Sequence, residues 1–242
     1  MNRQNALKNI RIVLNGAVHP GNIGASARAL KTMGLARLYL VAPQRYPDAE
    51  AAWRASRATD VLDSAIVCAT LDEALAGVAF AVACSARSRE IAVPEVSARQ
   101  AAKEVVAAAR AQEAALVFGN ETFGLTTEEV NKCRLIATIP AAPDYSSLNL
   151  AAAVQVFAYE LRMAAISELA GGPPERPRQL ASHEEIEGFY EHLERTMVEA
   201  GFFDPEHPKK LMPRLRRLFA RAQLEKEEVN ILRGILRSFR RS

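Results

Sequence analysis

Apolar residues in the first two thirds of the chain form short runs that alternate with longer segments of helical spacing. The runs predict strands at residues 10–14, 38–41, 79–84, 115–118 and 135–139. The intervening periodicity and its capping residues predict helices at 22–33, 72–76, 97–111, 126–132 and 147–169. Strands that alternate with helices are typical of an α/β fold whose mostly parallel sheet is covered by helices on both faces.

The pattern changes after residue 169. Residues 170–182 are rich in Gly, Pro and charged residues, a composition typical of a linker. Beyond them, apolar residues recur every three or four positions over 184–200, 209–222 and 227–239, which predicts amphipathic helices alone. We therefore predict a sheet domain over 1–169, a linker over 170–182 and a small all-α extension over 183–242.

Charge is distributed unevenly between these parts. Residues 209–242 carry 11 Lys and Arg against 3 Asp and Glu, whereas residues 1–208 carry 20 basic against 25 acidic residues. A basic extension on a mildly acidic body favours a polyanion such as nucleic acid as the partner. The alternative is a helix whose charged face is simply solvated.

The spacing of the cysteines and histidines and the hydropathy of the chain argue against a metal site, a membrane span and a secretory signal. The three cysteines form no C-x-x-C pair, and two lie in apolar runs, as is typical of buried thiols in a cytoplasmic protein. The four histidines lack the spacing of metal ligands, so we expect no metal. No apolar run reaches the roughly 18 residues of a membrane span, and residues 1–8 lack the apolar core of a secretory signal.

Polar and small residues gather in three segments near the ends of predicted strands. They are 19–28 (HPGNIGASAR), 118–125 (FGNETFGL) and 145–150 (YSSLNL). Parallel sheets bind ligands at the carboxyl ends of their strands, so the segments predict one shared site. Gly21 and Gly24 would let the backbone approach a ligand, Arg28 can bind a phosphate through two hydrogen bonds, and Ser146 or Ser147 would cap the next helix.

In order and spacing, these segments resemble the three motifs of the SpoU family of SPOUT RNA methyltransferases, over residues 10–163. Segments 189–194, 215–219 and 230–236 resemble the C-terminal helices of the branch that methylates the ribose 2′-hydroxyl of cytidine or uridine at nucleotide 32 of the tRNA anticodon loop. The resemblance implies a C-terminal trefoil knot in the sheet domain, S-adenosylmethionine (SAM) as cofactor, tRNA as partner, and a homodimer with its active site at the subunit interface.

The resemblance also assigns site residues. The catalytic group would be Arg28, Asn22, Glu121, Ser147 and Asn149. The cofactor-binding group would be Cys84, Ser85, Ala86, Gly119, Asn120, Ile139, Ser146, Ser147 and Leu148. This chain departs from the common pattern at Asn120, where arginine is frequent, and at Cys84, where threonine is usual.

Proton management in such a reaction admits two interpretations. A guanidinium is almost always protonated, so we favour Arg28 as the group that stabilises the developing alkoxide and fixes the neighbouring phosphate, which takes the proton. His19 is the alternative base because its ordinary pKa lies near neutrality, although a turn residue before Pro20 explains it equally simply. RNA contacts are expected from Lys209, Lys210, Arg214, Arg216, Arg217, Arg221, Arg233 and Arg237.

Three other functions remain open at this stage. A nucleotide-dependent enzyme would share the alternating pattern, but the chain lacks both G-x-G-x-x-G and G-x-x-x-x-G-K-[ST]. A catalytically inactive RNA-binding protein would keep the basic extension but would not need Arg28, Glu121 and Asn149 together. A SPOUT methyltransferase acting on another RNA is the third alternative.

Overall fold

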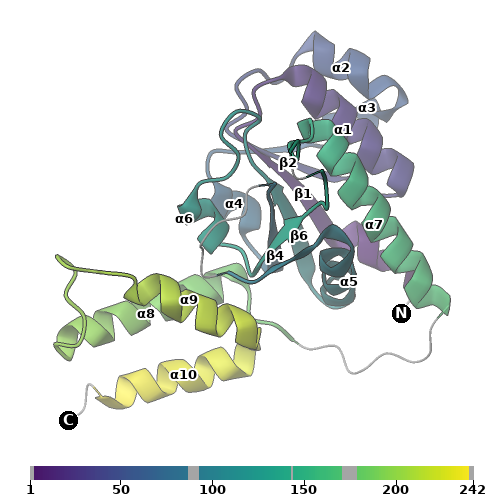
Figure 1. Cartoon of the computed structure of the whole chain (residues 1–242). Coiled ribbons are helices and arrows are strands. Elements are labelled where there is room, and N and C mark those ends of the chain that lie inside the picture. The colour runs from purple at the N-terminus through teal and green to yellow at the C-terminus, as the bar shows by residue number, and fades with distance from the viewer. Residues whose placement is uncertain (1–2, 87–92, 143, 171–178, 240–242) are drawn as a thin grey trace.

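A computed structural model describes residues 3–86, 93–142, 144–170 and 179–239, and a seven-stranded sheet forms its centre (Figure 1). Every strand pair is parallel, and the strand order is β3-β2-β1-β6-β4-β7-β5. The strands are β1 (Ile10–Asn15), β2 (Arg37–Val41), β3 (Ile66–Cys68), β4 (Val78–Cys84), β5 (Glu95–Ser97), β6 (Glu113–Phe118) and β7 (Leu135–Thr138). The predicted parallel α/β sheet is confirmed.

Helices cover both faces of the sheet because successive strand residues point to opposite sides. In β1, Ile12 and Leu14 join one buried cluster and Val13 joins the other. The first face carries α1 (Pro20–Met33), α5 (Ala98–Ala109) and α7 (Leu150–Ala170), and α2 (Ala49–Ala55), η2 (Ser56–Ala58) and α3 (Thr59–Asp63) pack on α1. The second face carries α4 (Leu71–Leu75) and α6 (Thr127–Asn131). The short 3-10 helix η1 (Arg3–Asn9) precedes β1.

Local sequence signals set several helix ends. Gly34 ends α1 with a left-handed φ of 79°, a conformation that glycine adopts without strain. Thr126 and Glu129 form the predicted capping box of α6. The sequence analysis missed α2, α3, β3 and β5, because each is too short for its periodicity to stand out.

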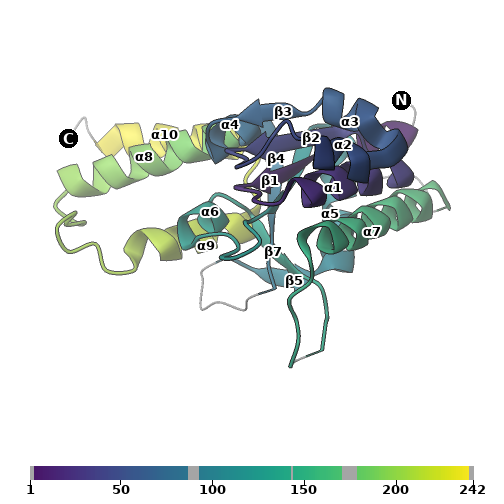
Figure 2. The ribbon, with the colours of Figure 1, turned by 90° about the horizontal axis from the view of Figure 1, so that it is seen from above.

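The predicted start of the long helix at residue 147 was wrong, since α7 begins at Leu150. Asn149 caps it: the carboxamide oxygen accepts hydrogen bonds from the backbone N–H of Ala151 at 3.0 Å and of Ala152 at 3.4 Å. Asparagine is as good a helix N-cap as serine, and Asn149 stands nearer the first helical turn than Ser146 or Ser147. Ser146 and Ser147 instead lie exposed in the segment between β7 and α7, which projects from the helical layer (Figure 2).

One helix in the described part of the chain, α7, is long and apolar enough to cross a membrane over the window Leu150–Ser167. Glu160 and Arg162 interrupt that window, and Phe157 and Leu161 are fully buried where α7 packs between α1 and α5. We interpret α7 as the central helix of the first layer. Among the described side chains of α7, the apolar groups of Tyr159, Met163 and Ile166 are exposed on its outer side.

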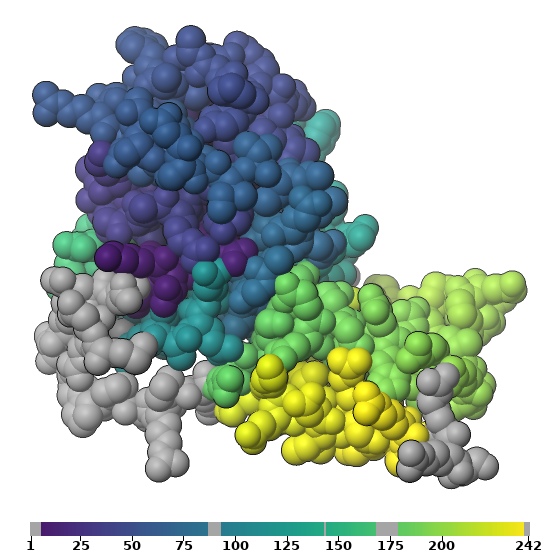
Figure 3. Space-filling model, turned by 180° about the vertical axis from the view of Figure 1, so that it is seen from behind, coloured from purple at the N-terminus to yellow at the C-terminus, as the bar shows by residue number. Residues whose placement is uncertain are grey.

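The C-terminal part forms three helices, α8 (His183–Glu199), α9 (Leu211–Ala222) and α10 (Lys226–Ser238), which protrude from one side of the sheet domain (Figure 3). They share a small buried cluster that includes Phe189, Tyr190 and Val229. Backbone groups of Leu180 bond the Gln112 side chain at 2.6 and 2.7 Å, which joins the two parts. Residues 171–178 of the predicted linker lie outside the described residues, so the three-part division stays a prediction.

An ionic cluster holds the amino-terminal end of the sheet together. Arg11 is only 7% exposed and donates from Nε to Glu113 at 2.7 Å, while Arg37 also pairs with Glu113. Nη2 of Arg11 also donates to Glu113, and Nη1 donates to the carbonyl of Ala74 at 2.8 Å. Burial raises the pKa of the Glu113 carboxyl, but hydrogen bonds from Arg37 and Arg11 outweigh it, so the net pKa is lowered.

Replacing Glu113 with glutamine should lower the free energy of unfolding at pH 7 by about 2 kcal/mol, because Arg11 stays buried without its carboxylate. A carboxyl whose pKa is lowered by folding stabilises fully above its unfolded value of about 4.3, and that stability is lost as pH falls through the folded value. The difference between wild type and E113Q in urea unfolding should therefore shrink in acid. A difference that is independent of pH would contradict the ionic role.

Candidate functional site

A pocket of about 630 Å³ opens at the carboxyl ends of β4, β6 and β7. Its walls come from all three polar segments, through His19 and Asn22 of the first, 118–122 with Gly124 and Leu125 of the second, and 145–150 of the third. Small-molecule sites usually enclose about 300–1,000 Å³, so the pocket can take a ligand of nucleoside size. Segments separated by about a hundred residues thus form one cavity, as the parallel sheet predicts.

Most of the predicted site residues line this pocket. All of the residues assigned to the cofactor do so, namely Cys84, Ser85, Ala86, Gly119, Asn120, Ile139, Ser146, Ser147 and Leu148. Four of the five predicted catalytic residues also line it, namely Asn22, Glu121, Ser147 and Asn149. Arg28 is the exception, and its side chain is exposed elsewhere on α1.

Glu121 organises the polar side of the pocket. Its Oε2 accepts the backbone N–H of Val18 at 2.9 Å, and its Oε1 accepts the backbone N–H of His19 at 3.2 Å and Nδ2 of Asn22 at 2.9 Å. Burial raises the pKa of this carboxyl, but the hydrogen bonds, led by that of Asn22, outweigh it and lower the net pKa. Glu121 is therefore an ionised anchor that orients the first segment, and it is poorly suited to act as a base.

The same network extends to the third segment. Asn149 donates from Nδ2 to Oδ1 of Asn22 at 2.9 Å, while its own Oδ1 caps α7. Glu121, Asn22 and Asn149 thus form a continuous chain of hydrogen bonds that ties together the loop after β6, the start of α1 and the start of α7. The side-chain amides of Asn22 and Asn149 each have a hydrogen-bond partner on the nitrogen and on the oxygen. Their orientations are therefore fixed before any ligand binds.

Arg28 lies outside the pocket because of helix geometry. At about 100° per residue, the six positions from Asn22 to Arg28 place the two side chains roughly 120° apart around α1. Gly24, one turn before Arg28, faces α2, where an added Cβ would lie 2.0 Å from the carbonyl oxygen of Ala51. The expectation that Gly24 admits a ligand is therefore wrong, because its missing side chain lets α1 pack closely on the backbone of α2. Gly21 also faces α2, where an added Cβ would meet the end of the Glu50 side chain at 2.6 Å, and neither glycine lines the pocket.

Asn120, which departs from the family pattern, braces the second segment. Its Nδ2 donates to the carbonyl of Gly16 at 2.9 Å, and its Oδ1 accepts the backbone N–H of Thr122 at 2.7 Å and of Phe123 at 3.2 Å. Gly119 beside it has no room for a side chain, because a Cβ would lie 2.3 Å from the backbone of Gly124. The carboxamide thus holds a tight turn over the end of β1.

The sequence analysis missed the apolar wall of the pocket. Phe118 and Phe157 pack edge to face at 5.5 Å, and Leu125, Leu150 and Ala153 extend the wall. The spacing of Leu150, Ala153 and Phe157 along α7 marks a single helical face and could have revealed it. Cys84, the second departure from the family pattern, adds to the wall: burial, with a further effect of nearby Cys133, raises the pKa of its thiol well above the usual value and keeps it neutral.

The eight basic residues expected to contact RNA separate into two groups. Arg216 forms two bonds with the Glu187 carboxylate, at 2.7 and 2.8 Å, and lies 4.2 Å over the ring of Tyr190, while Arg233 is half-buried. Both therefore contribute to packing of the helices. The other six are exposed on α9, α10 or the segment before them, namely Lys209, Lys210, Arg214, Arg217, Arg221 and Arg237.

Comparison with known proteins extends the resemblance to the whole chain. Residues 9–159 match the profile of the SpoU rRNA Methylase family, and residues 184–242 match that of the tRNA methyltransferase TrmJ C-terminal domain. The TrmJ tRNA (cytidine/uridine/adenosine-2′-O-)-methyltransferase of Pseudomonas aeruginosa is 48% identical over 95% of this chain and 93% of its own. The tRNA (cytidine/uridine-2′-O-)-methyltransferase TrmJ of Escherichia coli K12 is 49% identical over 96% and 95%.

A solved structure agrees with these sequence matches. The crystal structure of TrmJ from Zymomonas mobilis superimposes with a TM-score of 0.80 at 33% identity, covering 95% of this chain and 98% of that one. The match spans the sheet domain and the C-terminal helices together. The chain therefore belongs to the SpoU methyltransferase family and, within it, to the TrmJ proteins.

Proposed function

We propose that this protein uses SAM to methylate the ribose 2′-hydroxyl of cytidine or uridine at nucleotide 32 in the tRNA anticodon loop, in the cytoplasm. The observation that carries the proposal is the pocket in which the hydrogen-bonded chain of Glu121, Asn22 and Asn149 joins the three motif segments. The name of the Pseudomonas relative also includes adenosine, so adenosine belongs among the nucleosides to be assayed.

The pocket residues fit SAM, which when bound supplies an electrophilic methyl group. Its apolar wall of Phe118, Leu125 and Phe157 suits a flat base, and its other walls offer backbone and hydroxyl groups of Ser85, Ser146 and Ser147. Gly119, which admits no side chain, keeps the turn at the pocket wall tight. The neutral Cys84 thiol adds an apolar contact without competing for the methyl group as a thiolate.

The chain's own residues would position the ribose and manage its proton. Asn22 and Asn149, held by the Glu121 carboxylate, present fixed amides to the sugar. Arg28 would stabilise the negative charge that develops on the 2′-oxygen and hold the adjacent phosphate, which takes the proton. His19 remains the alternative base, because it lines the pocket and its side chain is exposed.

A homodimer reconciles the family role of Arg28 with its position. Arg28 lies outside the pocket of its own chain, so it can act at a pocket only if that pocket belongs to a second copy. The outer face of α7 supports such a partner, because Tyr159, Met163 and Ile166 are exposed on a helix with few charges. We propose that two copies pair there, that Arg28 serves the partner's pocket, and that the C-terminal part of the sheet domain carries the trefoil knot of the SPOUT fold.

Mixing two inactive variants tests the shared active site. Arg28→Ala removes the arginine, Glu121→Gln damages the pocket, and a mixed dimer holds one site with both residues intact. Random exchange makes half of the dimers mixed, so the mixture should recover about a quarter of wild-type activity. Recovery near zero, with exchange verified by mass spectrometry of the intact dimers, would mean that Arg28 serves its own chain.

The reaction itself is tested with purified protein, tritiated SAM and tRNA that lacks ribose methylation. We expect labelled 2′-O-methylcytidine or 2′-O-methyluridine, and cleavage mapping should place it at nucleotide 32. Transfer to a different tRNA ribose or to ribosomal RNA would replace the proposed substrate. Binding of SAM and tRNA without transfer would favour a catalytically inactive RNA-binding protein.

A further inference from the structure

We propose that the surface formed by α2 and η2 is a second tRNA contact, in which Trp53 stacks on an unpaired base while Arg54 and Arg57 bind backbone phosphates. This inference rests on the proposed function, since the RNA is the substrate that Arg28 serves. The C-terminal helices carry the basic surface predicted from sequence. The α2 surface lies on a different part of the molecule, at the far end of the sheet domain (Figure 1).

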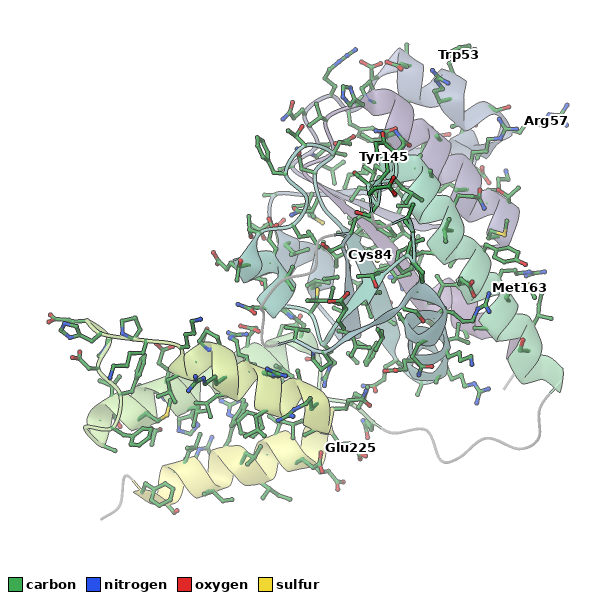
Figure 4. The ribbon with its side chains drawn as sticks, in the orientation of Figure 1. Trp53, Arg57, Cys84, Tyr145, Met163 and Glu225 are labelled. Carbon is green, nitrogen blue, oxygen red and sulfur yellow. The ribbon has the colours of Figure 1, made fainter. Side chains whose placement is uncertain are left out.

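Trp53 is the most informative residue of this surface. It is the single tryptophan of the chain, yet 74% of it is exposed at the outer side of α2. Figure 4 shows Trp53 and Arg57 directed away from the body of the protein. The guanidinium of Arg54 lies 5.1 Å from the indole centroid, so a flat aromatic face and a positive charge are presented together.

The charges around Trp53 leave two arginines available. Asp48 pairs with Arg45 at 2.8 Å, and Asp60 pairs with Lys31 at 2.7 Å. These pairs neutralise Asp60 and Asp48, whereas Glu50, one turn before Arg54 on α2, is exposed and has no ion pair among the described residues. Arg54 and Arg57 are exposed, and within the described part of the chain neither guanidinium has an ion pair. An anion would therefore meet two unpaired guanidinium groups beside an exposed indole.

The packing of α1 on α2 places this surface next to Arg28. A Cβ on Gly21 would lie 3.7 Å from Cγ of Arg54, and one on Gly24 would meet Ala51, so these positions face α2. Lys31 continues the same side of α1 and donates to the carbonyl of Arg57 at 2.8 Å. Arg28 stands four residues after Gly24 and three before Lys31, which puts it on that side as well. An RNA held at Arg28 must pass close to α2 and η2.

Single-stranded RNA loops match what this surface offers. Their bases are unstacked and free to lie on an aromatic ring, and their phosphates pair with arginine. An indole with guanidinium groups around it is the usual composition of such a contact. A second copy of the chain that paired through this same surface would bring the unpaired arginines of both copies together, whereas the phosphates of RNA neutralise them, which favours RNA.

Direct binding measurements test the inference without requiring turnover. By fluorescence anisotropy with labelled tRNA, R54E/R57E should raise Kd at least tenfold. Loss of two phosphate contacts should also reduce the slope of log K against log salt by about 1.4, at roughly 0.7 per contact. Trp53→Ala should raise Kd about tenfold, the effect of losing one stacked base, and Trp53→Phe should recover most of it. Kd for SAM should not change in any variant.

Lys8→Glu is the matched control, because Lys8 is exposed before β1, at the opposite end of the strands from the pocket. It should bind tRNA as wild type does. Wild-type affinity in R54E/R57E would overturn the inference. So would dissociation of Trp53→Ala into monomers in sedimentation velocity, since Trp53 would then be a subunit contact. If the wild type binds tRNA but methylates none, the proposed function fails. The tRNA affinities of the variants would still show whether the α2 surface contacts tRNA.

Discussion

Arg28→Lys should bind tRNA with nearly wild-type affinity and yet lose about 10²–10³-fold in kcat, the usual effect of removing one preorganised donor to a developing oxyanion. Lysine keeps the positive charge, so attraction to the backbone persists. It lacks the planar fork of the guanidinium, so it cannot hold a phosphate and the 2′-oxygen in one geometry. The loss should therefore appear in kcat rather than in KM for tRNA.

Single-turnover methylation with saturating tRNA, followed from neutral to alkaline pH, measures this effect. Arg99→Lys is the control, because Arg99 makes an exposed pair with Glu160 on the far side of α7 from α1 and should tolerate the change. If Arg28 acted as a base, the lysine variant would regain activity as its amine loses its proton, near a pKa of about 10.4. A near-wild-type rate at every pH would contradict both roles.

Glu121→Gln should lower kcat/KM about 100-fold or more, because the carboxylate accepts three N–H donors and an amide cannot. Its NH₂ group would face either the N–H of Val18, in the place of Oε2, or the N–H of His19 and Nδ2 of Asn22, in the place of Oε1. Each donor left unsatisfied costs about 1–3 kcal/mol, and the remaining bonds lose their charge-assisted strength, which together reach this magnitude. Asn149, which bonds to Asn22, should lose its orientation as well.

Glu128→Gln is the control for E121Q, because it makes the same chemical change at an exposed residue of the neighbouring helix α6. Thermal unfolding of both variants separates a damaged site from a damaged fold. We expect the melting temperature of E121Q to fall by a few degrees only, while SAM affinity and turnover both fall sharply. Full activity in E121Q would show that the hydrogen bonds seen at the pocket do not position the substrate.

Much of the fold follows from local sequence signals. The uninterrupted apolar run near residues 79–84 predicted a fully buried strand, and β4 is the buried neighbour of β6 and β7. Gly34 and the Thr126 capping box set helix ends through bonds that span only a few residues. Because the carboxyl ends of parallel strands lie at one edge of the sheet, the positions of the three motif segments in the sequence predict one shared site.

Other features depended on contacts between distant segments. The sequence suggested that Gly21 and Gly24 bind a ligand, and only the packing of α2 on α1 shows that Gly24 faces the backbone of Ala51 and Gly21 the side chains of Glu50 and Arg54. The choice of Asn149 over Ser147 as the cap, and the burial of Arg216 against Glu187, likewise depend on neighbours remote in sequence.

The sequence by itself thus determined the α/β class, most element positions and the polar segments that line the pocket, because capping, periodicity and strand ends are short-range properties. Tertiary structure alone decided that Glu121, Asn22 and Asn149 form one hydrogen-bonded chain and that the face of α1 bearing Asn22 meets the pocket, which leaves Arg28 outside the pocket of its own chain. Hydrogen bonds across about a hundred residues depend on distances and directions that residue order does not encode locally. The direction of Arg28 follows from the rotation of α1 against its neighbours, which packing sets.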